Sequence, residues 1–223
     1  SPQKSFGDLY QIDKSKALRL SYYSSYLMGC ELSEIGVNVN FSPVCDIFFD
    51  FAHNVIGDRS FSSDPNVVLD LSIEFCKGLT DSGLIPVPKH FPGHGRSTTD
   101  THKNVSIVDI APNNLINSDL VPFRILKDLS LVMLAHIIYS KIDEKVSTYS
   151  KKIIKEFLRK KFKFNGIILS DDISMEALSG KLKERVIKSY KGGCDIILYC
   201  KGKLDEMEVI QEFVKKIKKK HYD

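Results

Sequence analysis

The sequence predicts an α/β fold in which parallel strands close into a (β/α)8 barrel. Short apolar runs of strand type alternate with helical patterns along the 223 residues, as in the βα units of a buried parallel sheet. No GxGxxG motif joins a strand to a helix, so the dinucleotide fingerprint of a doubly wound sheet is missing. Charged and polar residues instead follow the strand runs, and the carboxyl ends of barrel strands carry the active site.

Five runs of apolar and β-branched residues are expected to form strands, at residues 37–44, 85–90, 131–138, 167–169 and 195–199. Prolines interrupt the second run, which makes it the weakest of the five. In a parallel barrel, polar residues at the ends of these runs meet at one rim. They are Asp46, Lys89, His90, His136, Asp171 and Asp172.

Four segments carry apolar residues three and four positions apart, which is the spacing of an amphipathic helix. They span residues 17–35, 67–79, 153–158 and 206–219. Ser150 precedes the third segment and is expected to cap its first free amides.

The composition is that of a globular protein, with 43% hydrophobic and 27% charged residues. The formal net charge is only +4, and the basic residues gather at 151–163 and 215–220, where they are expected on solvated helix faces or last helical turns. A nucleic-acid partner is therefore not expected. No uninterrupted apolar run approaches the roughly 18 residues of a membrane span, so no membrane partner is expected either.

The five cysteines predict reduced thiols and a cytoplasmic protein. Their number is odd and no CxxC pair occurs, so a disulfide framework is not expected. Cys194 and Cys200 flank an apolar run and are expected in the core. No signal peptide opens the chain, although it begins with Ser1, which leaves a removed targeting segment open.

The densest chemical segment is KHFPGHGRSTTDTH, residues 89–102. Its prolines and glycines predict a loop, and loops on rigid scaffolds often carry function. Asp100 stands two residues before His102, close enough to orient the imidazole and to stabilise its charged form. This pair predicts a general acid/base that works near neutral pH. The alternative is a polar loop whose side chains bond to its own backbone.

A metal site is the rival interpretation of the same loop. His90, His94, Asp100 and His102 are all zinc-ligand types. However, Phe-Pro-Gly separates the first two histidines, so they do not share a helix face, and the familiar short ligand spacings do not occur. We therefore expect no metal and no cofactor.

Ser170, Asp171 and Asp172 follow the apolar run Ile167 to Leu169. A carboxylate at the end of a rigid strand can act as a nucleophile, a base or a ligand, and Asp171, nearer the strand, is the better candidate. The alternative is that Asp172 or Ser174 caps a helix that begins near Met175.

Arg59 lies in the segment IGDRSFSSDP and could hold a polar or anionic substrate with its planar fork of donors. The alternative is a surface turn in which Arg59 forms a salt bridge with Asp58 or Asp64.

Several of these segments together resemble glycoside hydrolase family 3, in its β-N-acetylglucosaminidase branch. KHFPGHG followed by Asp-Thr-His resembles the signature loop of that branch. NFSPVCD, IGDRSF, NGIILSDDISMEAL, the Ala-His pair at 135–136 and GGCDIILYC resemble further family segments in the same order. Glucosidases of the wider family usually have Ser-Asp-Trp at the nucleophile, and this chain has no Trp, which favours the hexosaminidase branch.

The resemblance implies a role for each matched residue. Asp171 matches the catalytic nucleophile, His102 the acid/base and Asp100 its dyad partner. Arg59, Lys89 and His90 match residues that hold the hydroxyls of N-acetylglucosamine. The implied activity is that of a retaining β-N-acetylglucosaminidase without cofactor, which trims peptidoglycan fragments during cell-wall recycling in the bacterial cytoplasm.

The same resemblance implies that the fold is incomplete. A full barrel takes about 250 residues, only five strand runs are visible, and the family's early Asp-Gln-Glu-Gly-Gly segment has no counterpart. We expect a single catalytic domain over residues 1–223, a (β/α)8 TIM-type barrel lacking its first three strands. An open sheet edge exposes apolar surface, so we expect instability or weak activity unless an N-terminal segment or a second chain closes it.

Two other functions stay open from the sequence. The chain could be an inactive or partial sugar-binding remnant of the family, although none of the matched positions is substituted. It could also be a metal-dependent hydrolase that uses the histidine-rich loop. Turnover of an aryl N-acetylglucosaminide, before and after chelation, separates the three.

Overall fold

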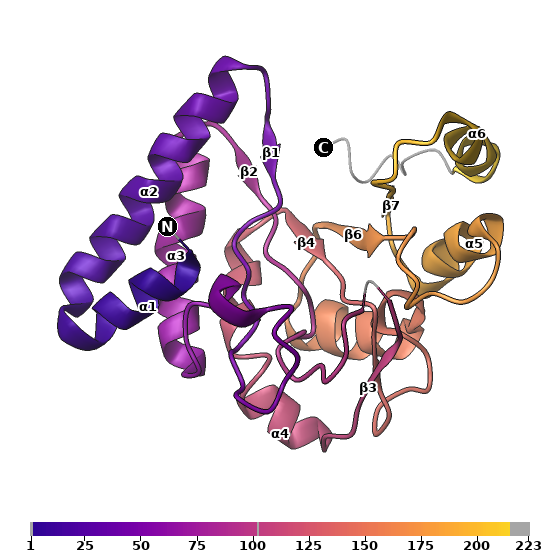
Figure 1. Cartoon of the computed structure of the whole chain (residues 1–223), viewed down its shortest axis with the longest axis horizontal. Coiled ribbons are helices and arrows are strands. Elements are labelled where there is room, and N and C mark those ends of the chain that lie inside the picture. The colour runs from indigo at the N-terminus through magenta and orange to yellow at the C-terminus, as the bar shows by residue number, and fades with distance from the viewer. Residues whose placement is uncertain (1, 102, 215–223) are drawn as a thin grey trace.

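The computed structural model describes residues 2–101 and 103–214. They form an α/β fold of short strands and surrounding helices (Figure 1). In chain order the elements are α1 (Gln3–Ile12), α2 (Lys14–Glu34), β1 (Val39–Asn40), η1 (Gly57–Arg59), α3 (Pro65–Asp81), β2 (Ile85–Pro86), β3 (Ser106–Val108), α4 (Pro112–Asn117), η2 (Pro122–Asp128), β4 (Leu131–Met133), β5 (Ile137–Tyr139), η3 (Ser147–Tyr149), η4 (Ile153–Lys161), β6 (Ile167–Asp172), α5 (Leu182–Gly192), β7 (Ile196–Leu198) and α6 (Leu204–Phe213).

Five parallel strands, here called the strand wall, follow one another in the order β1, β2, β4, β6 and β7. Three of their four contacts are parallel pairings, and the pairing of β6 with β7 has a register shift between Leu169 and Asp172. The fourth contact joins the residues that follow β2 and β4: Phe91 forms an isolated parallel bridge with Leu134, and the Phe91 amide donates to the Met133 carbonyl at 2.8 Å. The spatial order equals the sequence order, as expected for successive βα units. The predicted parallel α/β arrangement is confirmed, and among the described strands the wall ends at β1 and at β7.

The run 131–138 was expected to form one strand, and this is wrong, because it forms β4 and β5 separately. β5 leaves the wall and pairs in parallel with β3. The change of direction coincides with two contacts from residues 10 and 13 positions further along the chain. The carbonyls of Ala135 and Ile137 accept hydrogen bonds from the hydroxyls of Thr148 and Ser147, at 3.0 and 2.8 Å. Side chains therefore occupy backbone acceptors that a continuing strand would offer to a neighbour.

The helices cover the wall from two sides. Figure 1 shows α1, α2 and α3 gathered on one side and α5 and α6 on the other. α2 and α3 match the predicted helices, and they bury Ala17, Val68, Leu71 and Leu79 in one cluster with Leu84, which precedes β2. Tertiary packing of such an apolar stripe supplies most of the stability of a helix in a protein.

The predicted cap of the third helix is confirmed. The Ser150 hydroxyl accepts the Ile153 amide at 3.0 Å, and the helix that follows, η4, is wound as a π-helix with its basic residues in the last turn. The fourth predicted helix is present as α6, which begins at Leu204 and ends at Phe213. The rest of that prediction, with the basic run 215–220, lies outside the described residues.

β4 and the middle of β6 are buried on both faces, as in a parallel sheet covered by helices. Leu131, Met133 and Leu169 belong to one buried cluster, while their neighbours Val132 and Ile168 belong to another that includes η4. Successive side chains along these strands thus point into different cores, as expected from the two-residue period of a strand.

All five cysteines are free thiols, and Cys194 is buried as expected. The expectation for Cys200 is wrong, because it is exposed just past β7, where the apolar run has ended. No helix in the described part of the chain combines the length and the apolar character that crossing a membrane requires.

Candidate active site

A cavity of about 270 Å³ opens at the carboxyl ends of the wall strands. Four of the predicted site residues line it together, namely Arg59, Lys89, His90 and Asp171. A larger cavity of about 650 Å³ between η3 and α5 holds none of them. The smaller cavity is the candidate site, because it lies at strand ends and brings hydrogen-bond donors together with the Asp171 carboxylate.

Asp171 stands near the end of β6 and is largely buried. One of its oxygens lies 4.0 Å from His90 Nε2, and the other accepts the Asp172 amide at 2.8 Å. Burial raises the pKa of the Asp171 carboxyl, but the His90 and His136 rings outweigh burial and leave that pKa below its ordinary value. Asp171 is therefore a charged carboxylate that faces the cavity, as a nucleophile requires.

Asp172 also lines the cavity, but its side chain holds a turn. Its carboxylate accepts the amide of Ser174 at 2.9 Å and the amide of Cys200 at 3.1 Å, and it also accepts the Ser174 hydroxyl. The alternative that it caps a helix near Met175 is wrong, because turns follow β6 and the next helix begins at Leu182. The turn places Asp171, and not Asp172, against His90.

Lys89 and Arg59 form the cationic side of the cavity. Burial lowers the pKa of the Lys89 ammonium, the Arg59 charge lowers it further, and Asp171 opposes both. Arg59 Nη1 donates to the Val55 carbonyl at 3.1 Å. The alternative salt bridge to Asp58 or Asp64 is not among the ion pairs of the described residues. The Asp64 carboxylate instead caps α3 through the amide of Asn66.

Asp46 contacts the candidate site, and the sequence predicted its position at the rim without assigning it a role. It is 1% exposed and accepts three hydrogen bonds, from the His90 amide at 3.2 Å, the His94 amide at 2.6 Å and His90 Nδ1 at 2.7 Å. Burial opposes its charge, but His90 outweighs burial and holds the pKa of Asp46 below its ordinary value. Its place just after the first strand was the signal that pointed to the same rim.

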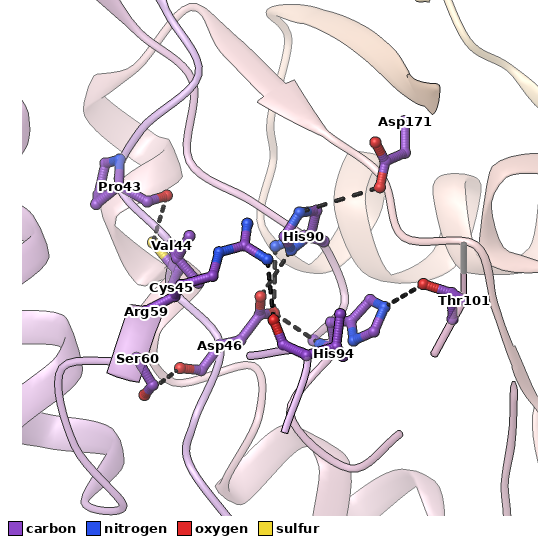
Figure 2. A network of polar contacts seen from close by, with 12 residues as sticks. Pro43, Val44, Cys45, Asp46, Arg59, Ser60, His90, His94, Thr101 and Asp171 are labelled. Atoms are coloured by element: carbon purple, nitrogen blue, oxygen red, sulfur yellow. Dashed lines mark hydrogen bonds and ion pairs between the residues drawn. The ribbon is translucent and has the colours of Figure 1, made fainter. Parts of the chain in front are cut away.

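His94 connects Asp46 to Thr101, because its amide donates to Asp46 and its ring contacts Thr101. Its Nε2 lies 2.7 Å from Thr101 Oγ1, and Nδ1 is buried without a partner among the described residues. Burial, with a contribution from His90, lowers the pKa of His94 to about 4, so the ring is neutral at pH 7. Figure 2 shows His90 between Asp46 and Asp171, and His94 turned toward Thr101.

The predicted dyad is only partly described. Asp100 immediately precedes Thr101, which lines the cavity, and the Asp100 carbonyl accepts the amides of Lys103 and Asn104 at 3.0 Å. His102 lies outside the described residues. The loop therefore reaches the cavity at Thr101, one residue before the predicted acid/base.

His136 contacts the backbone at the end of β6. It is fully buried, and its Nε2 lies 3.1 Å from the Asp172 carbonyl, which can only accept, so Nε2 carries a proton. Its Nδ1 contacts the Thr148 hydroxyl at 2.7 Å. Burial lowers the pKa of His136 even though Asp171 opposes the change.

The described part of the histidine-rich loop bears on the metal alternative. Among the residues that the structure describes, no group of three or more His, Cys, Asp and Glu side chains is arranged to hold an ion. His90 Nδ1 and His94 Nε2 are each engaged with a protein partner.

Comparison with known proteins relates this geometry to a family. The model of the glycosyl hydrolase family 3 N-terminal domain matches residues 5–222. A β-hexosaminidase of Hydrogenovibrio crunogenus is 36% identical over 210 residues, and one of Tolumonas auensis is 37% identical over 202 residues. These alignments cover 92% and 88% of this chain, and 58% and 60% of the two relatives.

A solved structure is similar to this chain over nearly its whole length. NagZ from Neisseria gonorrhoeae, in complex with N-trifluoroacetyl-D-glucosamine, superposes with a TM-score of 0.89 at 32% identity. The superposition covers 98% of this chain and 64% of NagZ. The chain thus spans about three fifths of the length of the relatives that it matches.

Proposed function

This chain belongs to glycoside hydrolase family 3, and we propose that it carries the active site of a retaining β-N-acetylglucosaminidase. The observation that carries the proposal is the Asp171 carboxylate, which is held in its charged form and faces a cavity whose donors are Arg59, Lys89 and His90. Such donors can hydrogen-bond to the hydroxyl groups of a sugar ring, and a charged carboxylate can attack the anomeric carbon. The N-acyl glucosamine bound by the Neisseria gonorrhoeae relative supports this substrate class.

The first half-reaction forms a covalent intermediate. An oxygen of Asp171 bonds to the anomeric carbon while the bond from that carbon to the glycosidic oxygen breaks. His102, oriented by Asp100, gives its proton to the departing oxygen, which leaves as a free hydroxyl. The products are a glycosyl ester of Asp171, a neutral His102 and the released remainder of the glycan.

The second half-reaction returns the enzyme to its starting state. His102 takes a proton from water, the water oxygen bonds to the anomeric carbon, and the ester bond to Asp171 breaks. Two inversions retain the β configuration. Most glycosidases use a second carboxylate as the acid/base, so the assignment of a histidine to this step is the distinctive part of the proposal.

The substrate proposed is a terminal β-linked N-acetylglucosamine, as found in peptidoglycan fragments during cell-wall recycling. The named relatives are bacterial β-hexosaminidases, which supports that source. We place the reaction in the cytoplasm, in agreement with five free thiols.

Activity of the whole protein is proposed to need a closed barrel. In the described wall, β1 and β7 each have one strand neighbour, and unpaired strand edges invite pairing with another segment. We propose that a further segment or a second chain pairs with these edges.

Hydrolysis of 4-nitrophenyl N-acetyl-β-D-glucosaminide tests the function. We expect Asp171→Ala and His102→Ala each to lower kcat/KM by about 10³-fold or more, as for other nucleophile and acid/base groups that act as a unit. Asp128→Asn, a matched change of an exposed carboxylate, should leave kcat/KM within about twofold. Turnover of Asp171→Ala close to that of the unmodified protein would refute the assignment.

Two further observations complete the test. Proton NMR of the first product should show the β anomer before mutarotation. Binding of N-acetylglucosamine without any turnover would identify a sugar-binding remnant instead of an enzyme. Loss of activity on chelation would favour the metal-dependent hydrolase.

A further inference from the structure

Asp46 is a buried carboxylate that does not touch the cavity, yet it contacts two residues that do. Its Oδ1 accepts the amides of His90 and His94, and its Oδ2 faces His90 Nδ1 at 2.7 Å. A carboxylate that accepts two backbone amides is held in its charged form. Because a charged carboxylate can only accept hydrogen bonds, His90 Nδ1 must carry a proton.

The other nitrogen of the same ring faces the nucleophile candidate. His90 Nε2 lies 4.0 Å from an oxygen of Asp171, and the His90 side chain is 7% exposed. The imidazole therefore stands between two carboxylates, one at each ring nitrogen (Figure 2). A positive ring in this place is opposite in charge to both neighbours, whereas a neutral ring leaves two buried carboxylates without a charged partner between them.

We propose that Asp46 is a positioning residue that holds His90 as an imidazolium beside Asp171, and so keeps the nucleophile charged before the sugar binds. The inference rests on the proposed role of Asp171 as the nucleophile. Asp46 acts only through His90, which transmits its effect to the cavity.

Other charged and titratable groups also face the pair, from every element around it. They are Lys89 after β2, Arg59 in η1, His94 in the loop that follows Lys89, His136 after β4, Asp172 in β6 and Cys200 after β7. Burial lowers the pKa of His94 to about 4, so that ring is neutral at pH 7, and burial also lowers the pKa of His136. His90 is the ring whose two nitrogens both face carboxylates.

Asp46→Asn is the informative substitution, because it keeps the shape and changes the hydrogen-bonding type. The amide oxygen can still accept the two backbone amides, but the amide nitrogen then faces His90 Nδ1 as a donor. The ring responds with the other tautomer, in which Nδ1 accepts and Nε2 carries the only proton. The same exchange in a serine protease triad gives the wrong tautomer and a large loss of rate.

The test is the dependence of kcat/KM on pH between 4 and 8 with the aryl N-acetylglucosaminide. An opposite charge at 4–6 Å lowers a carboxyl pKa by about 1–3 units. We therefore expect the acidic limb of Asp46→Asn to move up by about one pH unit or more, with a lower plateau. Asp119→Asn is the matched control, because Asp119 is equally buried but pairs with Arg96, away from Asp171. It should leave the limb in place.

An Asp46→Asn limb that coincides with that of the unmodified protein would overturn the proposal, whatever happens to the plateau. Should Asp46→Asn fail to fold, ¹⁵N NMR of histidine-labelled unmodified protein decides, with His90→Gln used for assignment. Both His90 nitrogens should be protonated at pH 6, and an unprotonated Nε2 at that pH refutes the proposal. This measurement needs no turnover, so a failure of the proposed function is recognised separately.

Discussion

Replacing Thr101 by Val removes one hydroxyl from the loop that precedes His102. Thr101 is 1% exposed, and its hydroxyl lies 2.7 Å from His94 Nε2. Val has nearly the same shape, so the change tests the hydrogen bond and not the packing. Because His94 Nδ1 has no partner among the described residues, the variant leaves neither ring nitrogen with a hydrogen bond to that part of the chain.

The unpaired imidazole sets the size of the losses expected for Thr101→Val. Leaving a buried polar group unpaired costs about 1–3 kcal/mol, and we expect the free energy of unfolding in urea to fall by this amount. If the bond also holds the loop at the cavity, kcat/KM should fall by roughly 5- to 150-fold, since 1.4 kcal/mol corresponds to a factor of ten. The loss should be larger for an alkyl glycoside, which needs proton donation to its leaving group, than for a dinitrophenyl glycoside, which does not.

Two matched variants accompany the assay. Thr101→Ser keeps the hydroxyl and should stay within about 0.5 kcal/mol of the unmodified protein. Thr99 has a buried hydroxyl without a partner among the described residues, so Thr99→Val removes no hydrogen bond and should be neutral or stabilising. Equal loss on both substrates, or equal destabilisation by Thr99→Val, would refute the reasoning.

Three further predictions concern stability. Burial lowers the pKa of His94 to about 4, so this ring binds its proton more weakly in the folded than in the unfolded chain. The free energy of unfolding should therefore fall as pH drops from about 6.5 toward 4, by up to roughly 3 kcal/mol. In urea titrations, His94→Gln should flatten this dependence on pH. Gly95→Ala would place a Cβ 1.8 Å from the Ile47 carbonyl oxygen, so we expect insoluble or unfolded protein, and a soluble variant with a normal melting curve would contradict the contact. Ser150→Ala removes the cap of Ile153 and should cost about 1 kcal/mol, measured by thermal unfolding; an unchanged Tm would show that the cap contributes nothing.

Local patterns were sufficient for much of this protein. Apolar periodicity predicted α2 and α3, and the short apolar runs predicted the strands of the wall. The polar residues after those runs then predicted the rim, because strand ends of a parallel sheet lie together. Arg59, Lys89, His90 and Asp171 do line one cavity. Each of these predictions depends on the residue itself and on neighbours a few positions away.

Other features depend on contacts between distant segments, which no local pattern contains. The split of residues 131–138 into β4 and β5 follows from hydroxyls of Ser147 and Thr148. The exposure of Cys200 follows from where β7 ends in the wall.

The sequence by itself determined the alternation of strands and helices, the family resemblance and the identity of the residues at the rim. Only the tertiary structure decided that Asp46, 44 positions before His90 in the chain, contacts that ring and that the ring in turn faces Asp171. The physical reason is that hydrogen bonds and charge interactions act over a few ångströms in space. Three strand ends must therefore be brought side by side before a buried carboxylate, an imidazole and a nucleophile can affect one another.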